Sequence, residues 1–275
     1  MINNDFLVYP TICKDPELPS LIDGFVTEYR ESCTGSQTSV NNDIFSYVQF
    51  RLSKTGTFFR KRADSQNLIV AKWVSLIYNK SLMIIGSNSP VYFQGITKDY
   101  LRDVARLSPD PNVIKELPIK LLKSGIILIY EPSLSSLKVD GVAFNLMNKY
   151  FVIGISFRFP RLDHFWFTLL HELSHAYLHY SLFEQARSVD LQIGFDVEEL
   201  AANKLAKESF VEKHIWANCP PKYERSEQSI IEFAKKQGVH PSIIAGMLQR
   251  EQHDYKIYRR IVDSIDTRKL VFNNE

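Results

Sequence analysis

The fold of this chain is decided at residues 165–179, which have the sequence FWFTLLHELSHAYLH. The stretch contains no Pro and no Gly, and its apolar residues recur at helical spacing, so it predicts a buried helix. Positions four apart lie on one face of a helix, because a helix has about 3.6 residues per turn. His171 and His175 can therefore bind one metal ion, with Glu172 beside them. A zinc ion lowers the pKa of a water molecule that it binds, and a neighbouring carboxylate can take the proton, so the motif predicts a zinc metalloprotease.

The five-residue pattern HExxH also arises by chance. The alternative interpretation is a half-buried helix whose histidines bond to backbone carbonyls. Three features of the chain favour the metal site. Two His and one Glu interrupt a strongly apolar segment, where polar groups without partners would be costly. The flanking residues are small or apolar, and a suitable third ligand lies downstream.

The third ligand is expected on a second helix, in a segment rich in helix formers at residues 197–208. This segment offers two adjacent carboxylates, Glu198 and Glu199. Asn203 follows Glu199 by one turn on the same face, where an amide can orient a ligand histidine. Glu199 is therefore the predicted ligand, and Glu198 is its solvated neighbour. The alternative is that both are surface carboxylates.

The motif helix has two further polar residues, His179 and Asp163, for which the sequence predicts other roles. His179 follows His175 by four residues and could support the site from outside the ligand shell, donate a proton, or form the polar end of the helix, which is the favoured interpretation. Asp163 is predicted as the N-cap of the helix, because Asp is a preferred N-cap residue.

The two segments resemble the ImmA/IrrE family of metallopeptidases. Residues 171–179, HELSHAYLH, and residues 199–206, ELAANKLA, are similar to the family pattern H-E-x-x-H-x-x-x-H followed by E-x-E-A-N/D-x-F/L-A. Ala201 departs from it, which removes one carboxylate and leaves the inferred ligand. The resemblance implies the metal ligands His171, His175 and Glu199, the catalytic carboxylate Glu172, and Asn203 at the family's Asn/Asp position.

Further segments resemble one branch of this family, in which the peptidase-like domain is usually fused behind a helix-turn-helix repressor of the XRE/HigA-antitoxin type. Residues 1–44 are too short and irregular for such a domain, which counts against autonomous operator binding. The resemblance implies a zinc-dependent endopeptidase that cleaves a cognate transcriptional repressor or antitoxin-like protein in a stress or phage-defence response. The segments that carry it are residues 58–62, 140–143, 152–155, 161–168 and 240–246.

Two other functions remain open. The first is a regulatory binding module, a sensor or antitoxin-like partner in which hydrolysis is weak or absent. The second is a DNA-binding regulator that uses a helical hairpin at residues 227–250 and a basic patch around residues 60–62. That hairpin offers DNA mainly Ser242, Gln249 and Arg250, so a plain hairpin closing the catalytic core is favoured, and the basic patch is favoured as a solvated face.

Composition places the chain among cytosolic proteins with no membrane partner. It has 275 residues, of which 45% are hydrophobic, enough for one large or two modest cores. A formal net charge of +2 says nothing of partners. The N-terminus lacks the basic region of a signal peptide, and no apolar run is long enough to span a membrane. The three cysteines, Cys13, Cys33 and Cys219, are widely spaced and fit reduced thiols.

The chain is predicted to be α+β and mainly helical, with a small antiparallel β-sheet packed on a zincin-like HExxH helix. A boundary at the prolines near residue 110 separates an N-terminal arm and helical region, residues 1–110, from a metallopeptidase domain with a C-terminal helical hairpin, residues 111–275. Residues 1–44 are predicted as a loose arm and residues 181–196 as a loop. Helices are predicted at residues 21–29, 44–51, 68–81, 97–106 and 113–123, a strand at 125–130, and a strand hairpin at 140–146 and 150–156.

Overall fold

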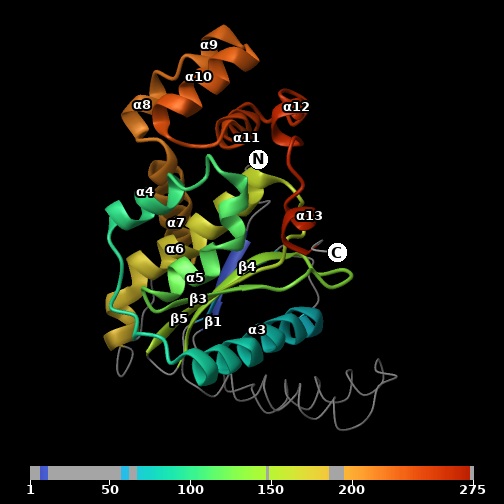
Figure 1. Cartoon of the computed structure of the whole chain (residues 1–275). Coiled ribbons are helices and arrows are strands. Elements are labelled where there is room, and N and C mark those ends of the chain that lie inside the picture. The colour runs from blue at the N-terminus through green and yellow to red at the C-terminus, as the bar shows by residue number, and fades with distance from the viewer. Residues whose placement is uncertain (1–6, 12–56, 62–66, 147–148, 186–194, 273–275) are drawn as a thin grey trace. The chain divides into compact units, whose positions relative to one another are not determined.

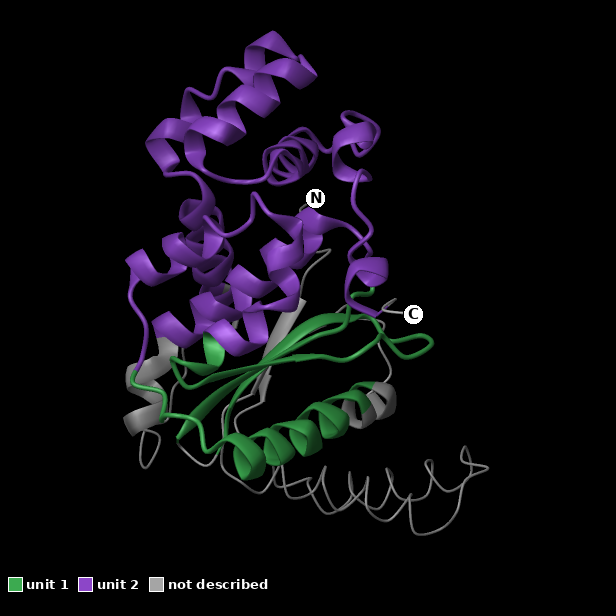
Figure 2. Cartoon of the chain, in the orientation of Figure 1, with its two compact units in different colours: residues 1–94, 121–158, 181–196 green, residues 95–120, 159–180, 197–275 purple. Residues whose placement is uncertain are grey.

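The computed structural model describes residues 7–11, 57–61, 67–146, 149–185 and 195–272. The chain divides into two compact units, each assembled from separate stretches of sequence (Figure 2). The described residues are mostly helical with a small sheet, which confirms the predicted α+β class. Unit 1 comprises Met1–Gln94, Leu121–Arg158 and Ser181–Asp196, and unit 2 comprises Gly95–Lys120, Phe159–Tyr180 and Val197–Glu275.

Unit 1 contains the sheet, whose strand order is β1-β2-β4-β5-β3 (Figure 1). The predicted hairpin is present, with β4 and β5 paired antiparallel. However, β3 pairs with β5 in parallel, so the sheet is mixed rather than antiparallel throughout. The chain reverses direction on either side of β4, and these two reversals leave β5 running the same way as β3. The strands are β1 (Leu7–Thr11), β2 (Thr57–Lys61), β3 (Ile126–Tyr130), β4 (Val139–Leu146) and β5 (Tyr150–Ile155).

The sheet of unit 1 is covered by the long helix α3 (Asn67–Asn88), which lies along it (Figure 1). Trp73 and Ile77 of this helix are fully buried in one core with Val142 and Val152 of the strands. The indole N–H of Trp73 donates to the Glu131 carbonyl at 3.1 Å, so its one polar group is satisfied. The helix predicted at residues 68–81 is thus confirmed, and it continues for two further turns.

Two strands lie where the sequence indicated other structure. β1 falls in the region predicted as a loose arm, and β2 falls between predicted helices. β2 pairs with β4, far along the chain, and a strand that depends on a distant partner is not visible in local periodicity. The helices predicted at residues 21–29 and 44–51 lie outside the described residues.

The helix predicted at residues 113–123 is interrupted. A short 3₁₀ helix, η1 (Pro111–Lys115), is followed by a separate helix, α5 (Leu117–Leu122). Pro118 explains the break, because proline lacks an N–H to donate and is tolerated only in the first turn of a helix. The preceding helix, α4 (Lys98–Ala105), confirms the prediction for residues 97–106, and Thr97 caps it by accepting from the Tyr100 N–H.

The described residues of unit 2 form helices, and one of these is the motif helix α6. Its two longest helices, α6 and α7, are separated by residues 186–194, which lie outside the described residues. The two ends of the loop predicted at residues 181–196 are helical, because α6 continues to Gln185 and α7 begins at Phe195. The helices are α6 (Leu162–Gln185), α7 (Phe195–Phe210), α8 (Lys213–Ala217), α9 (Pro221–Glu224), α10 (Glu227–Gln237), α11 (Pro241–Gln252), α12 (Arg259–Val262) and α13 (Thr267–Phe272).

The helical hairpin predicted at residues 227–250 is confirmed as α10 and α11. Ser226 caps α10 by accepting from the Ser229 N–H. Gly238 ends α10 at φ 67°, a left-handed conformation that glycine adopts without steric cost. His240 caps α11 by accepting from the Ser242 N–H. The capping residues Ser226, Gly238 and His240 therefore stand where the two helices of the hairpin begin and end.

Asp163 is not the N-cap of α6, because the helix begins one residue earlier. Its carboxylate is buried and takes a two-pronged hydrogen bond from Arg161, with Nε–Oδ1 at 2.9 Å and Nη2–Oδ2 at 2.8 Å. Arg161 Nη2 also donates to Oε1 of Gln249 on α11 at 2.8 Å. Burial raises the pKa of the Asp163 carboxyl, and the Arg161 guanidinium opposes that rise. This buried polar cluster ties the start of the motif helix to α11.

Gly246 of α11 leaves room for this cluster, so Gly246→Ala is expected to destabilise the fold by about 2–4 kcal/mol. A Cβ at this position would stand 2.2 Å from Asp163 Oδ2 and 2.9 Å from its Cγ. The carboxylate cannot move aside without losing Arg161. The measurement is the free energy of unfolding in urea.

Gly86→Ala is the matched control, because it is also a helical glycine and a Cβ there meets nothing within 4 Å. It should stabilise the protein by up to about 1 kcal/mol through helix propensity. Equal effects of the two substitutions would show that the contact with Asp163 is not the cause.

Candidate metal centre

Two histidines of the motif helix face one point. α6 passes through residues 165–179 without a helix breaker, so His171 and His175 lie one turn apart on one face. Both side chains are buried, at 1% and 0% exposure. Their Nε2 atoms are 3.0 Å apart. The periodicity of the sequence thus places two imidazole nitrogens together in the interior.

Glu199 of α7 joins them. Its Oε2 lies 3.1 Å from His171 Nε2, and its Oε1 lies 3.1 Å from His175 Nε2. Glu199 is buried at 5% exposure, whereas Glu198 beside it is partly exposed. One ligand atom from each of His171, His175 and Glu199 can be chosen so that all lie within 4.8 Å of one another. This buried group can hold a metal ion.

The separations suit a small divalent ion. A tetrahedral zinc site with ligands at about 2.0–2.1 Å holds those ligands roughly 3.3 Å apart. The three separations here, 3.0, 3.1 and 3.1 Å, are close to that spacing. Two imidazoles and one carboxylate form a three-ligand set, which leaves one tetrahedral position for water or substrate. The residues therefore fit an ion that has an exchangeable position.

Asn203 fixes which ring nitrogen of His171 carries a hydrogen toward it. Its Oδ1 lies 3.1 Å from His171 Nδ1. An amide oxygen can only accept, so Nδ1 carries the hydrogen and donates it. The Nε2 atom of His171, which faces Glu199, is then the ring nitrogen that can bind an ion once it has given up its proton. Outer partners of this kind fix the tautomer and orientation of metal-binding histidines.

Glu199 is held in the ionised state. Burial acts to raise the pKa of its carboxyl, but hydrogen bonds and charge from His171 and His175 outweigh burial and bring the pKa to about 2. For Glu198, burial raises the pKa of the carboxyl. The two neighbouring carboxylates therefore differ in environment, and it is Glu199 that lies against the two histidine nitrogens.

Glu172 is buried at 1% exposure next to the first histidine. Successive residues of a helix are rotated by about 100° around its axis. His171, His175 and Glu172 therefore all leave α6 on the same side, within an arc of about 100°. His179 also belongs to α6, and its side chain lies outside the described residues. The structure therefore brings together His171, His175, Glu199 and Asn203, with Glu172 buried on the adjoining part of the helix surface.

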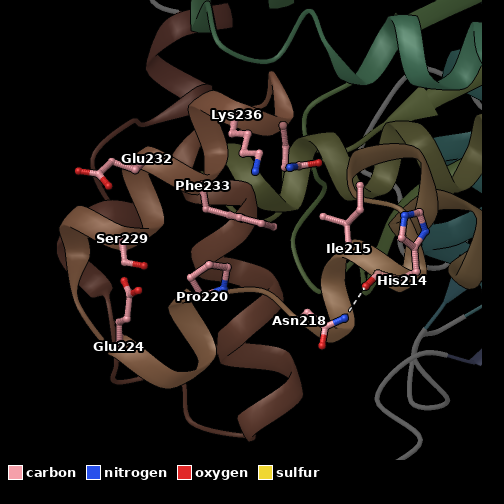
Figure 3. A pocket seen from close by; sticks show the side chains of 10 residues that line it. His214, Ile215, Asn218, Pro220, Glu224, Ser229, Glu232, Phe233 and Lys236 are labelled. Atoms are coloured by element: carbon pink, nitrogen blue, oxygen red, sulfur yellow. Dashed lines mark hydrogen bonds between the residues drawn. The ribbon is translucent and has the colours of Figure 1, made fainter.

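Unit 2 also has a pocket of about 510 Å³ over helices α8 to α10 (Figure 3). Phe233 and Ile215 give it an apolar wall, and Glu232 and Lys236 stand at its rim. No sequence motif indicated it, because its residues come from three separate helices and the turns between them. It is lined by His214, Ile215, Asn218, Pro220, Glu224, Ser229, Glu232, Phe233, Lys236 and Gln237.

The hairpin of α10 and α11 is poorly suited to reading DNA. A recognition helix presents polar side chains to the bases, but Ser242 and Gln249 of α11 are fully buried. Arg250 is half-buried, and its guanidinium carbon lies 4.4 Å from the ring centre of Phe167. The basic side chains around residues 60–62 lie outside the described residues. The side chains that the hairpin would need for reading DNA are instead packed inside unit 2.

Comparisons of the chain with protein-family models, with curated proteins and with solved structures gave no match. Within the described part of the chain, every helix is too short or too polar to cross a membrane.

Proposed function

We propose that this chain is a zinc-dependent metalloendopeptidase. The observation that carries the proposal is the buried group of His171, His175 and Glu199 on two helices, with the carboxylate of Glu172 buried next to it. A metal site with only a structural role would not need an additional buried carboxylate on the motif helix. Glu172 is costly to bury, and a catalytic role explains its presence.

Zinc is the proposed metal because of the ligand set. Neutral imidazoles and a carboxylate are common zinc ligands, and two His with one Glu is a set found in catalytic zinc sites. When bound, the ion would supply a Lewis acid and lower the pKa of a coordinated water.

The chain's own residues would manage the protons and the geometry. His171, His175 and Glu199 would bind the ion, and Asn203 would keep His171 in its binding tautomer. Glu172 would accept a proton from water and later pass it to the leaving amine of the cleaved peptide bond. Burial strengthens these interactions, because charges interact more strongly away from bulk water.

The proposed substrate is a transcriptional repressor of the helix-turn-helix type or an antitoxin-like protein. This part of the proposal is supported by the resemblance of residues 171–179 and 199–206 to the ImmA/IrrE pattern. We also propose a cytoplasmic location, supported by three cysteines without a C-x-x-C pair. Cys219 is a free, buried thiol, and burial raises its pKa to about 11, so it is an unreactive group.

The test is the profile of new protein N-termini in a cell extract whose original N-termini have been blocked. The full chain loaded with zinc should create new termini, and the same chain stripped by a chelator should create none. Restoring zinc should restore the same cleavage positions. Equal termini with and without zinc, or none with the loaded chain, would count against a zinc peptidase.

A second candidate function is a ligand-sensing module, and the pocket over α8 to α10 favours it. Its volume of about 510 Å³ lies within the range of small-molecule sites. Such a module would act without hydrolysis, so a partner protein would co-purify intact and would bind Glu172→Gln as well as wild type. Zinc-dependent cleavage of that partner would exclude this alternative.

A further inference from the structure

Helices α6 and α7 meet along one stripe of residues on each helix. On α6 the stripe is Phe167, His171 and His175, spaced four apart. On α7 the corresponding residues are Phe210, Asn203 and Glu199, which lie on one face because eleven residues make about three turns. The chain directions are opposite, since early residues of α6 meet late residues of α7. The metal ligands are therefore one end of a longer helix–helix contact.

Three cross-helix contacts define this stripe. Phe167 and Phe210 pack edge to face with ring centres 5.0 Å apart. Asn203 Oδ1 accepts from His171 Nδ1 at 3.1 Å, and Glu199 Oε1 lies 3.1 Å from His175 Nε2. Ala206, which is fully buried, lies on the same face of α7 between Asn203 and Phe210. The aromatic pair is the one large apolar contact in this series.

A third helix holds the aromatic pair in place. The guanidinium carbon of Arg250 on α11 lies 4.4 Å from the ring centre of Phe167. Phe167 is thus in contact with Phe210 on α7 and with Arg250 on α11. A cation over an aromatic face is attracted by the negative charge density of the ring. α11 itself is fixed to the start of α6 through Arg161 and Gln249.

We propose that the stack of Phe210, Phe167 and Arg250 sets the register between the two ligand-bearing helices and so controls metal affinity from a distance. A slip of one turn, about 5.4 Å, would carry Glu199 away from His175. The buried polar contacts specify the register at the ligand end of the stripe, and the aromatic pair specifies it at the other end. The aromatic pair and the cation above it resist the slip without an ion. These three are positioning residues for the metal ligands. The inference rests on the metal-binding part of the proposed function and not on hydrolysis.

The test is a titration of the full chain with Co(II), whose visible absorption reports the geometry of the ligands. Phe210→Ala is expected to raise the Co(II) dissociation constant about 10–100-fold and to change the absorption spectrum, as loss of supporting groups around a metal site does. Phe233→Ala is the matched control, because Phe233 is another buried phenylalanine of unit 2, on α10 and outside the stripe. It should leave Co(II) affinity within about threefold of wild type while lowering thermal stability to a similar extent.

Arg250→Met is a second variant that keeps the core intact and tests the same register. It should raise the Co(II) dissociation constant several-fold, and Arg250→Lys should recover part of the loss. Lys204→Met, which removes an exposed cation of α7, is its control and should change nothing. Equal effects in each variant and its control would overturn the proposal. Failure of wild type to bind Co(II) or Zn(II) would instead overturn the proposed function, and this inference with it.

Discussion

Replacing His175 by Ala is expected to strip the metal from this chain. His175 is fully buried, and its Nε2 lies within 3.1 Å of both His171 Nε2 and Glu199 Oε1. Removing it leaves two protein ligands and a hydrophobic hole. If a binding free energy of about 10–16 kcal/mol is shared among four ligands, loss of one lowers affinity by roughly 10²–10³-fold. Elemental mass spectrometry after dialysis should find about one zinc per chain in wild type, the occupancy of one four-coordinate site, and almost none in the variant.

Two adjacent glutamates provide a sharp internal comparison for this prediction. Glu199→Ala should lose the metal as His175→Ala does, because its carboxylate lies 3.1 Å from both histidine nitrogens. Glu198→Ala should keep it, because Glu198 is the partly exposed neighbour on the same helix. The two variants change composition identically. Metal retained in Glu199→Ala and lost in Glu198→Ala would show that the third ligand is wrongly assigned.

Glu172→Gln is expected to keep the metal and to lose hydrolysis. Gln has the size and shape of Glu but cannot accept a proton at neutral pH. General acid–base groups contribute about 10²–10⁴-fold to rate, so the rate constant for cleavage should fall by that factor. The measurement pairs metal content with cleavage of the substrate found from the N-terminal profile.

Metal content is the control that gives the Glu172 result its meaning. A variant that loses both zinc and cleavage would indicate that Glu172 supports the site structurally. A variant that keeps both would remove Glu172 from the mechanism. Only zinc kept and cleavage lost fits the proton-transfer role, since the fold and the ligands are then unchanged.

The pair of histidines in the candidate metal centre could be predicted from the sequence because its spacing is local. His171 and His175 are four apart in a segment without helix breakers, and any helix there brings them together. The choice of Glu199 over Glu198 rested on Asn203 following it by one turn. In the structure that asparagine lies 3.1 Å from His171, on the face that carries Glu199. Periodicity within single helices was enough for these residues.

Features that depend on distant partners escaped prediction. The parallel pairing of β3 with β5 depends on the order in which strands add to the sheet, which no local pattern encodes. Asp163 has the residue type of an N-cap, but Arg161 and Gly246 give it a buried site instead. The turn before α11 was visible in Gly238, while the burial of every residue from Ser242 to Gln249 was not. Helical patterns show that a helix forms, and tertiary contacts decide which of its faces are covered.

The division into interleaved units has a consequence for the order in which the chain can fold. Unit 2 begins with Gly95–Lys120, is interrupted, and is completed only by Val197–Glu275. One contact across this gap is the hydrogen bond from the His240 N–H to Ser108 Oγ at 3.1 Å, which joins residues 132 positions apart. On the ribosome Ser108 must therefore wait for 132 further residues to be synthesised before this contact can form. Contacts between such distant residues close large loops and form slowly, so unit 2 should become structured only after its last segment has been synthesised.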